Sequence, residues 1–435
     1  MTNDNNLNIE KNKENVSKKV PELRFQGFVD AWEQRKFSET FNFPISTNSL
    51  SRAMLNYDRG EVKSIHYGDV LIKYPSILDI RREEIPFITN GTLEKYKAHL
   101  LVNGDLIFAD AAEDEAVGKA VEIEGITDEN IVSGLHTIVA RANQHKAQYF
   151  LGYYINSDIY HRQLLRLMQG SKVSAISKGN LQKTKVIFPK DIGEQQKIGA
   201  FFKKFDTLIT LHQRKLDKLK QLKQGYLQLL FPQNDEKVPR IRFANFDENW
   251  EQRKLGNYTK YITKGTTPKD KSGNGVINFV KVENISNGRI NPVSKISEEE
   301  HENYLKRSKL EENDILFSIA GTLGKTAVVD SLILPANTNQ ALAIIRGYDF
   351  DRNFLITSLV GNVVEKFIRR NPTIGAQPNL SLEQISNLFI ITPPGEEQQE
   401  IGLFFKQLDN TITLHQSKLD KLNSQKQVLL QKIFI

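Results

Sequence analysis

The sequence predicts two α/β domains, related by a pseudo-two-fold axis and separated by two long antiparallel α-helices that form a coiled-coil spacer. Three observations predict this fold. A long and a short segment each occur twice, the long segment has heptad spacing, and the stretches between them alternate strand-like and helix-like patterns. With 435 residues, of which 39% are hydrophobic, the chain is long enough for two or three domains with ordinary cores.

The chain is an imperfect duplication. Its long repeat pairs residues 194–231 with 397–434, and 24 of the 38 aligned positions are identical. Its short repeat pairs residues 20–36 with 238–254, with 10 identities in 17 positions. The short segments lie 218 residues apart and the long ones 203, so the first block between them is 15 residues longer. The short and long repeats are therefore similar in the two copies, whereas the blocks between them have diverged.

Both copies of the long repeat are predicted to be helices, because inward-facing positions recur at alternating steps of four and three residues. Pro189 and Pro394, each followed by acidic residues, mark the two starts, and Pro232 ends the first helix. At 1.5 Å per residue each helix would be roughly 57 Å long. The predicted spacer-helix core consists of Ile198, Phe202, Phe205, Ile209, His212, Leu216, Leu219, Ile401, Phe405, Leu408, Ile412, His415, Leu419 and Leu422.

A heptad helix of this length needs a partner helix, since alone it would expose its apolar stripe. We expect the other copy in the same chain to be that partner, at high effective concentration. The alternative is a coiled coil between two chains. A two-fold axis between related halves would make the helices antiparallel. In a centred register His212 and His415 would face each other as a polar layer that sets the register. The alternative is that both point outward, and no third ligand for a metal is evident.

Composition restricts the remaining possibilities. The chain has no cysteine, which excludes disulfides, thiolate metal sites and cysteine nucleophiles. No run of 18 apolar residues occurs, and residues 1–19 resemble a disordered tail without the apolar region of a signal peptide. We therefore expect a cytoplasmic protein. A net charge of +7 and a pI of about 9.1 favour a polyanionic partner such as nucleic acid, the alternative being a basic protein without one.

Each block between the repeats is predicted to be a small α/β domain. Both contain three short strand-like stretches followed by a helical pattern. A glycine–lysine turn joins the first two strands in each block, ending at Lys119 and Lys325. The strand-like and helical stretches are 105–112, 117–125, 134–141 and 147–169 in the first block, and 314–321, 325–330, 340–347 and 350–370 in the second.

No catalytic residue set is found. The loop "GTLGKT" (321–326) leaves two residues between its glycines where a Walker A loop needs four, so we reject nucleotide hydrolysis. The Asn-Pro pairs at 291–294 and 371–374 do not continue as the Asn/Asp-Pro-Pro-aromatic motif of amino-methyltransferases. His, Asp and Glu lack metal-ligand spacing, and no glycine-rich cofactor fingerprint follows a strand. We predict no catalytic residues, no metal site and no cofactor bound by this chain.

The ordered duplication resembles the specificity subunit of type I restriction-modification systems. The resemblance extends over about residues 20–435. The first block departs from the family-like spelling, with "EAVGK" (115–119) and "VSGLH" (132–136). The stretches that carry the resemblance are "EQQKI" (194–198), "EQQEI" (397–401), "YITKGTTPKDKSG" (261–273), "FVKVENISNGRI" (279–290), "SKLEENDILFSIAGTLGKTAVV" (308–329) and "NTNQALAI" (337–344).

The resemblance implies a domain plan, which we expect to follow the duplication. Residues 1–19 would be a disordered tail, and residues 20–190 and 238–393 the two target-recognition domains. Residues 191–237 would hold the central conserved helix and a linker, and residues 394–435 the C-terminal conserved helix.

The resemblance also implies a function. The two domains would bind double-stranded DNA and recognise a bipartite, asymmetric target. Modification subunits, expected to be two, and restriction subunits would join this chain, and they would carry the S-adenosylmethionine, ATP and Mg that the complex uses. The chain itself would be non-catalytic. Two alternatives are a self-contained DNA methyltransferase or nuclease, and a coiled-coil scaffold that forms homo-oligomers without DNA specificity.

Basic side chains on the loops of both blocks are predicted to contact DNA phosphates, and Lys, Arg, Asn and Gln on these loops are predicted to read bases in the grooves. Trp32 and Trp250 of the short repeat are predicted to pack against the helices. The predicted DNA-binding residues of the first block are Lys63, His66, Arg81, Arg82, Lys119, His136, Lys172 and Lys178. Those of the second block are Lys260, Lys264, Thr267, Lys269, Lys281, Asn284, Lys325, Asn337, Asn339, Gln340, Gln377 and Asn379.

Overall fold

The chain folds into two compact units, Met1–Leu211 with Leu419–Ile435, and His212–Lys418. The prediction of a disordered tail falls outside the described residues except for strand β1 (Ile9–Lys11), which pairs antiparallel with β2 (Leu23–Phe25). Across the described chain no helix has the length and apolar character needed to cross a membrane. The computed structural model describes residues 9–11, 20–168, 173–233, 236–270, 272–286, 288–292, 294–370 and 379–435.

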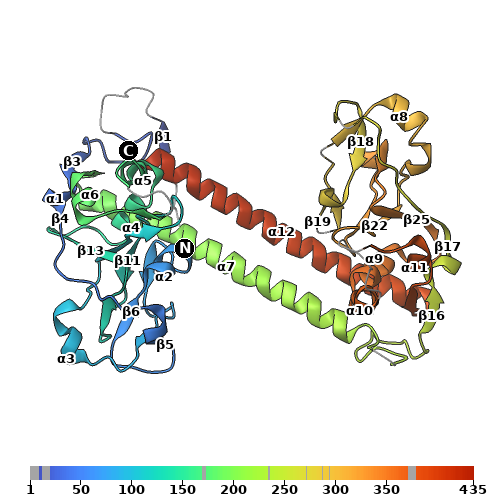
Figure 1. The fold of residues 1–435 in the computed structure, drawn as a ribbon, viewed down its shortest axis with the longest axis horizontal. Helices are drawn as coiled ribbons and strands as arrows, with labels where there is room; N and C mark the ends of the chain where they lie inside the picture. The colour runs from blue at the N-terminus through green and yellow to red at the C-terminus, as the bar shows by residue number, and fades with distance from the viewer. Residues whose placement is uncertain are drawn as a thin grey trace. The chain divides into compact units, whose positions relative to one another are not determined.

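The first unit is built around two sheets, labelled in Figure 1. The five-stranded sheet has the order β4 (Phe41–Asn42), β13 (Thr137–Ala142), β9 (Leu106–Ala109), β11 (Ala120–Glu124), β7 (Ile77–Asp79). The four-stranded sheet has the order β12 (Ile131–Ser133), β6 (Lys63–Ile65), β8 (Phe87–Ile88), β5 (Leu55–Asn56). Two further pairs join β15 (Lys185–Phe188) to β3 (Glu33–Lys36), and β10 (Ala111–Ala112) to β14 (Ser174–Ala175). Its short helices are α1 (Phe37–Thr40), α2 (Tyr67–Ile72), α3 (Leu93–Tyr96), α4 (Phe150–Ile155), α5 (Asp158–Leu165) and α6 (Lys178–Lys183).

The second unit has a smaller version of the same arrangement. Its four-stranded sheet has the order β17 (Thr259–Lys264), β25 (Leu342–Tyr348), β22 (Ile315–Ser318), β23 (Thr326–Val328). Its three-stranded sheet has the order β21 (Ser294–Ile296), β18 (Ile277–Val280), β24 (Ala336–Thr338). Two pairs join β16 (Glu251–Lys254) to β26 (Phe389–Thr392), and β19 (Ile285–Ser286) to β20 (Arg289–Ile290). Its short helices are α8 (Glu298–Glu302), α9 (Arg352–Val360), α10 (Asn362–Arg370) and α11 (Leu382–Ser386).

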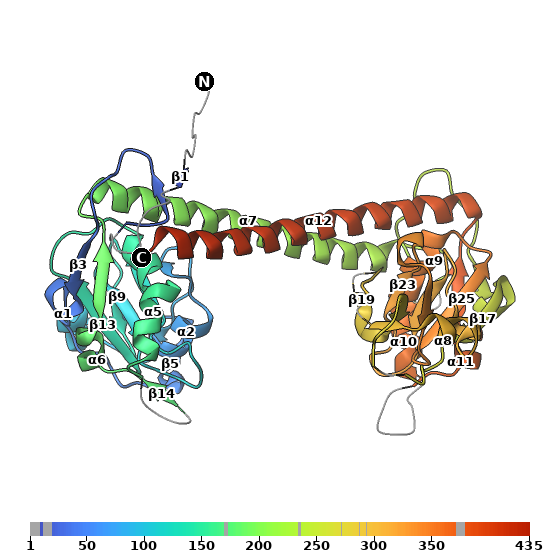
Figure 2. The ribbon, with the colours of Figure 1, turned by 90° about the horizontal axis from the view of Figure 1, so that it is seen from above.

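The predicted strands are confirmed in both blocks, and they occupy equivalent places. In each unit the first strand of the set, β9 or β22, lies between the other two and pairs antiparallel with both, as Figure 2 shows for β9 beside β13. The register matches as well, because Thr137 lies opposite Ala109 while Leu342 lies opposite Ser318. Each unit has a corresponding parallel pair, β6 with β12 and β18 with β24, and in the first unit β7 also pairs parallel with β11. The two domains therefore share one central topology.

The central strands lie inside the domains rather than at their surface. Every residue of β9 and of β22 is buried, which explains why these strands appear in the sequence as continuous apolar runs rather than alternating ones. Fully burying one such Leu, Ile or Phe side chain contributes roughly 1.5–3 kcal/mol. The loops at the strand ends are thus held by a rigid interior.

Two long helices, α7 (Ile192–Leu229) and α12 (Gly395–Ile433), confirm the helix prediction. The Asp191 carboxylate accepts a hydrogen bond from the Gly193 N–H at 2.6 Å and so satisfies a donor at the start of α7. The helices pair antiparallel within each unit. In the first unit Phe202 stacks on Phe434 with ring centroids 5.7 Å apart, and Asp206 pairs with Lys426, farther along α7 and earlier along α12.

The pairing within the second unit follows the same pattern. The Lys223 ammonium lies 2.6 Å from Asp409 Oδ1, at the positions that correspond to Lys426 and Asp206 in the other copy. His212 and His415 meet as the centred register requires, with their Nδ1 atoms 3.3 Å apart and their ring centroids 5.5 Å apart. Because a hydrogen bond between two Nδ1 atoms needs one donor and one acceptor, this contact requires at least one neutral ring.

The predicted helix core is buried to different degrees. The half-buried members are Phe205, Ile209, His212, Leu219, Ile412 and Leu422. The buried members are Ile198, Phe202, Leu216, Ile401, Phe405, Leu408, His415 and Leu419.

The short repeat fastens each domain to the start of a long helix. Arg24 binds the Glu194 carboxylate with two hydrogen bonds of 2.7 and 2.8 Å. Its counterpart Arg242 binds Glu397 with two bonds of 2.7 Å, and both glutamates are almost fully buried. These glutamates begin the repeated Glu-Gln-Gln phrase, so in both copies the first residue of that phrase binds the arginine of the short repeat.

Tryptophan and phenylalanine side chains complete each attachment, as predicted for Trp32 and Trp250. Trp32 is buried, and its Nε1 donates to Glu194 Oε1 at 3.3 Å. Trp250 packs edge-on against Phe231 with ring centroids 6.0 Å apart. Phe231 also stacks on Phe354 at 5.7 Å, so the end of α7 packs into the second unit. Each such aromatic pair adds about 0.5–1.5 kcal/mol beyond its buried area.

Candidate nucleic-acid interface

Some of the predicted DNA-binding residues lie at the same topological place in both units, the carboxyl ends of the parallel pairs β6–β12 and β18–β24. In the first unit His66 directly follows β6, and His136 lies three residues after the end of β12. In the second unit Lys281 directly follows β18, and Asn339 and Gln340 follow β24. We call these two places the strand-end sites. Their positions match, but their side chains do not.

The strand-end site of the first unit is a cluster of rings and carboxylates. The Tyr67 ring lies 4.6 Å from the His66 ring and 5.2 Å, edge-on, from the His136 ring. His136 Nδ1 lies 3.2 Å from Asp110 Oδ1. Burial, and then the positive Arg52 guanidinium, lower the pKa of His66. Burial raises the pKa of Asp110, while its contact with His136 opposes that shift.

Several members of this cluster were not predicted from the sequence. Arg52 is ion-paired with Asp69 of α2, and its Nη2 donates to the Tyr57 hydroxyl at 2.8 Å. The Lys73 ammonium lies 5.2 Å above the Tyr57 ring. A cation over an aromatic ring is attracted by the negative face of the ring, so this contact holds Lys73 beside Tyr57. No local pattern marks these residues, because they come from three separate segments.

The strand-end site of the second unit is a hollow of about 230 Å³. Four predicted residues line it: Thr267, Lys281, Asn339 and Gln340. The Thr267 hydroxyl donates to the Gln340 side-chain oxygen, and Asn339 Oδ1 accepts from the Ala341 N–H at 3.2 Å. The amide groups of these side chains are of the kind that reads base edges, and the lysine is of the kind that binds phosphate.

Three predicted residues are set aside as DNA contacts because they are buried. Asn337 is fully buried, and its Nδ2 donates to the Leu305 carbonyl at 2.8 Å while its Oδ1 lies 2.5 Å from His301 Nδ1. Asn284 accepts from the Lys281 N–H at 2.7 Å and so holds a turn. His66 is also buried, and its Nδ1 accepts from the Gly68 N–H at the start of α2. These residues were predicted to contact DNA from their residue type, but their burial shows that they stabilise the protein interior instead.

The two glycine-turn lysines occupy equivalent places, and each donates to a backbone carbonyl of a neighbouring helical segment. Lys119 Nζ donates to the Leu71 carbonyl at 2.8 Å, and burial lowers the pKa of this lysine. Lys325 Nζ donates to the Val282 carbonyl at 3.3 Å, next to Lys281. Both side chains are half-buried, and their acceptors lie in short helical segments, Leu71 in α2 and Val282 in a 3-10 turn after β18.

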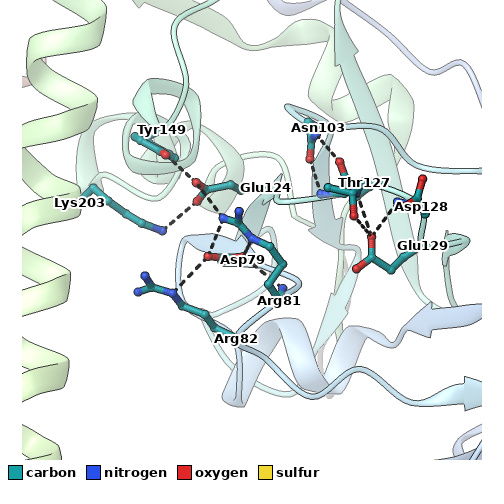
Figure 3. A network of polar contacts seen from close by, with 11 residues as sticks. Asp79, Arg81, Arg82, Asn103, Glu124, Thr127, Asp128, Glu129, Tyr149 and Lys203 are labelled. Carbon is teal, nitrogen blue, oxygen red and sulfur yellow. Dashed lines mark hydrogen bonds and ion pairs between the residues drawn. The ribbon is translucent and has the colours of Figure 1, made fainter.

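Arg81 and Arg82 belong to a network of ion pairs that reaches α7 (Figure 3). Both lie against Asp79, with shortest contacts of 2.9 Å for Arg81 and 3.4 Å for Arg82. Glu124 accepts from the Tyr149 hydroxyl at 2.6 Å and lies 3.1 Å from the Lys203 ammonium of α7. This network ties β7 and β11 to the helix, so the structure does not bring these two arginines together with His136.

The other predicted residues are distributed over the surface. Lys63 is half-buried beside the Phe87 ring. Lys172 and Gln377 lie outside the described residues. The exposed members are Lys178, Lys260, Lys264, Lys269 and Asn379.

Comparison with known proteins decides the family. The model described as the type I restriction modification DNA specificity domain matches residues 30–221 and again 247–424, the two halves of the duplication. The chain belongs to this family. In type I restriction-modification systems the specificity subunit recognises the DNA sequence and is not catalytic. DNA and the methyltransferase and restriction subunits are therefore its partners.

The relatives of the chain fit this family. It is 22% identical to the putative type I restriction enzyme MjaX specificity subunit of Methanocaldococcus jannaschii over 92% of each chain. It is 31% identical to the EcoBI specificity subunit of Escherichia coli over 36% of this chain and 35% of that one. Its fold matches the crystal structure of the type I S subunit from M. genitalium with a TM-score of 0.61, at 14% identity, over 96% of this chain and 99% of that one. A chain from a structural study of type I complex assembly matches with a TM-score of 0.52, at 18% identity, over 93% and 97%.

Proposed function

We propose that this chain recognises a bipartite, asymmetric DNA target, each unit reading one half, and brings methyltransferase and restriction subunits to it. The observation that carries the proposal is that two topologically equivalent strand-end sites hold different side chains. Imidazole and phenol groups lie in the first, around His136 and Tyr67. Amide and ammonium groups lie in the second, around Gln340 and Lys281. Two strand-end sites with the same backbone topology and different side chains would recognise different base sequences.

The chemistry of both sites supports contact with duplex DNA. Histidine and amide groups can donate to or accept from base edges in the major groove, where each base pair presents a distinct pattern. The lysines, together with the net charge of +7, would supply salt-dependent attraction to phosphates. The remaining exposed candidates, such as Lys264 and Lys269, are proposed as phosphate contacts.

Two modification subunits are proposed per chain, because the helix repeat presents one apolar residue twice. Leu211 and Leu414 hold the same position in the two copies, and they are 61% and 54% exposed. Exposed leucines kept in both copies indicate two like docking surfaces. Native mass spectrometry of the complex should show two subunits on the wild-type chain and one on Leu211→Lys or Leu414→Lys. Two subunits retained on both variants would contradict these docking surfaces.

The cofactors of the complex are proposed to lie on the partners. S-adenosylmethionine, ATP and Mg would be bound by the modification and restriction subunits, and the complex would act in the cytoplasm. Isothermal titration of the purified chain with S-adenosylmethionine should show no binding. Clear binding would contradict this assignment.

Methylation mapping tests the bipartite target. Cells that carry the modification subunit with this chain should show one split methylated motif, and cells without the chain should lack it. Replacing residues 20–190 with the first domain of another family member should change one half of the motif only. A motif that changes in both halves, or a continuous motif, would show that the units do not read separate half-sites.

A further inference from the structure

His136 has a left-handed backbone conformation. Its φ is +53°, in the left-handed region that non-glycine residues seldom adopt, at a cost of about 1–2 kcal/mol. Such strain persists only where the surrounding structure imposes it, and it is concentrated at functional positions. Here β13 begins directly after His136, and the Asp110 N–H donates to the His136 carbonyl at 3.0 Å. The backbone is therefore held in a conformation that places this ring at the strand-end site.

The ring of His136 is fixed as firmly as its backbone. Asp110 lies on one side, with its Oδ1 3.2 Å from His136 Nδ1. Tyr67 lies edge-on at 5.2 Å, and its own N–H donates to the Leu135 carbonyl at 3.4 Å. Asp110 is fixed in turn, because its carbonyl accepts from the Ile176 N–H at 2.9 Å. A side chain that is only half-buried is thus pre-oriented by three separate segments.

This orientation determines which ring atom is available. In the neutral ring Nδ1–H donates to the Asp110 carboxylate, which leaves Nε2 as a hydrogen-bond acceptor. Half of the side-chain surface of His136 is exposed, and within the described residues its Nε2 makes no hydrogen bond. An outward acceptor on a rigid ring suits an exocyclic amino group, which adenine and cytosine present in the major groove.

The second unit lacks this arrangement. By strand register His136 corresponds to Ala341, because the next residues, Thr137 and Leu342, lie opposite equivalent positions of the central strand. Alanine carries no hydrogen-bonding side-chain group. Any base reading through this position is therefore restricted to the first unit.

We infer that His136 reads one base pair of the first half-site through Nε2, and that Asp110 is its positioning residue. The inference rests on the proposed recognition of a split target. His136 Nε2 would accept one hydrogen bond, and the donor would be the exocyclic amino group of an adenine or a cytosine. One such single hydrogen bond contributes about two- to tenfold to discrimination at the base pair concerned.

The test is methylation mapping with His136→Asn and His136→Gly in the complete complex. Asparagine and glycine both accept the left-handed conformation, so neither should strain the loop. The motif of His136→Gly is expected to become degenerate at one position of one half-site. His136→Asn, whose amide still offers hydrogen-bonding groups, is expected to change the base preference at that same position. The second half is expected to be unchanged in both variants. Asp110→Asn is expected to relax the same position more weakly, because it disturbs the orientation of the ring and not the contact itself. A purely structural role for Asp110 would not relax a single position.

His145→Asn is the matched control, since His145 is an exposed histidine of the same unit in the loop before α4. It should leave the motif unchanged. An unchanged motif in both His136 variants, with melting temperatures equal to wild type, would overturn the inference while the wild-type split motif still stands. Absence of any split motif with the wild-type chain would overturn the proposed function instead. Melting curves of the complexes separate loss of reading from loss of folding.

Discussion

Replacing Arg242 by alanine should detach the second domain from α12. The guanidinium makes two 2.7 Å hydrogen bonds to the Glu397 carboxylate, and the Glu397 side chain is completely buried. Removing the arginine leaves a carboxylate without its cation in the interior. Breaking a buried pair in this way costs about 3–5 kcal/mol, because the desolvation of the remaining charge is no longer compensated. At 1.36 kcal/mol per factor of ten, the folding equilibrium constant of this unit should fall by a factor of roughly 10²–10⁴.

Arg240→Ala provides the control two residues away. Arg240 is 62% exposed and pairs with Glu236 at i,i+4, an arrangement worth only about 0.3–0.5 kcal/mol. A second control removes both charges: Arg242→Leu with Glu397→Leu should be less destabilised than Arg242→Ala alone, since no unpaired buried charge remains. Both controls isolate the unpaired carboxylate as the cause.

Urea denaturation followed by tryptophan fluorescence measures the effect. The chain has two tryptophans, one in each unit, so a Trp32→Phe background leaves Trp250 as the reporter of the second unit. Trp250 is buried beside Phe231 and Phe354, and its emission should shift to longer wavelength when this packing is lost. Equal losses of unfolding free energy for Arg242→Ala and Arg240→Ala would refute the reasoning.

Three further predictions concern pH and backbone packing. Burial and then nearby cations and His212 lower the pKa of His415 below its unfolded value of 6.5, so the second unit should lose stability as pH falls below about 6.5. His415→Gln should remove this dependence in thermal melts, and an unchanged slope would contradict it. Burial raises the pKa of Glu122 from 4.5 to about 7, so the first unit should lose stability as pH rises between these values. Glu122→Gln should flatten the plot of melting temperature against pH, and a slope equal to wild type would exclude Glu122 as the cause. Gly265→Ala should unfold the second strand-end site, because a Cβ there would lie 2.1 Å from a backbone oxygen of β24. The control Gly225→Ala places its Cβ in open space on α7 and should raise the free energy of unfolding by up to about 1 kcal/mol. Equal melting temperatures for the two variants would argue against this packing.

The sequence by itself determined the parts of the protein that depend on periodicity and repetition. The heptad steps predicted α7 and α12, because helical spacing is a local property that can be recognised in each copy separately. The centred register predicted that His212 and His415 meet. The repeated Glu-Gln phrase marked the helix starts. The comparison of the two copies also identified equivalent strands such as β9 and β22.

Only the tertiary structure decided which polar residues can meet DNA. Residue type alone proposed both Asn337 and His136, yet Asn337 is buried against His301 while His136 stands at an exposed strand end. Asp110 and Tyr67 carry no sequence signal for their contact with His136, because they lie 26 and 69 residues away from it in the chain. Burial and long-range contact arise from how the strands pack, and no local pattern encodes them. The repeats in the sequence thus determined the paired helices and the two equivalent domains, and the tertiary structure determined which polar side chains are exposed at the strand-end sites.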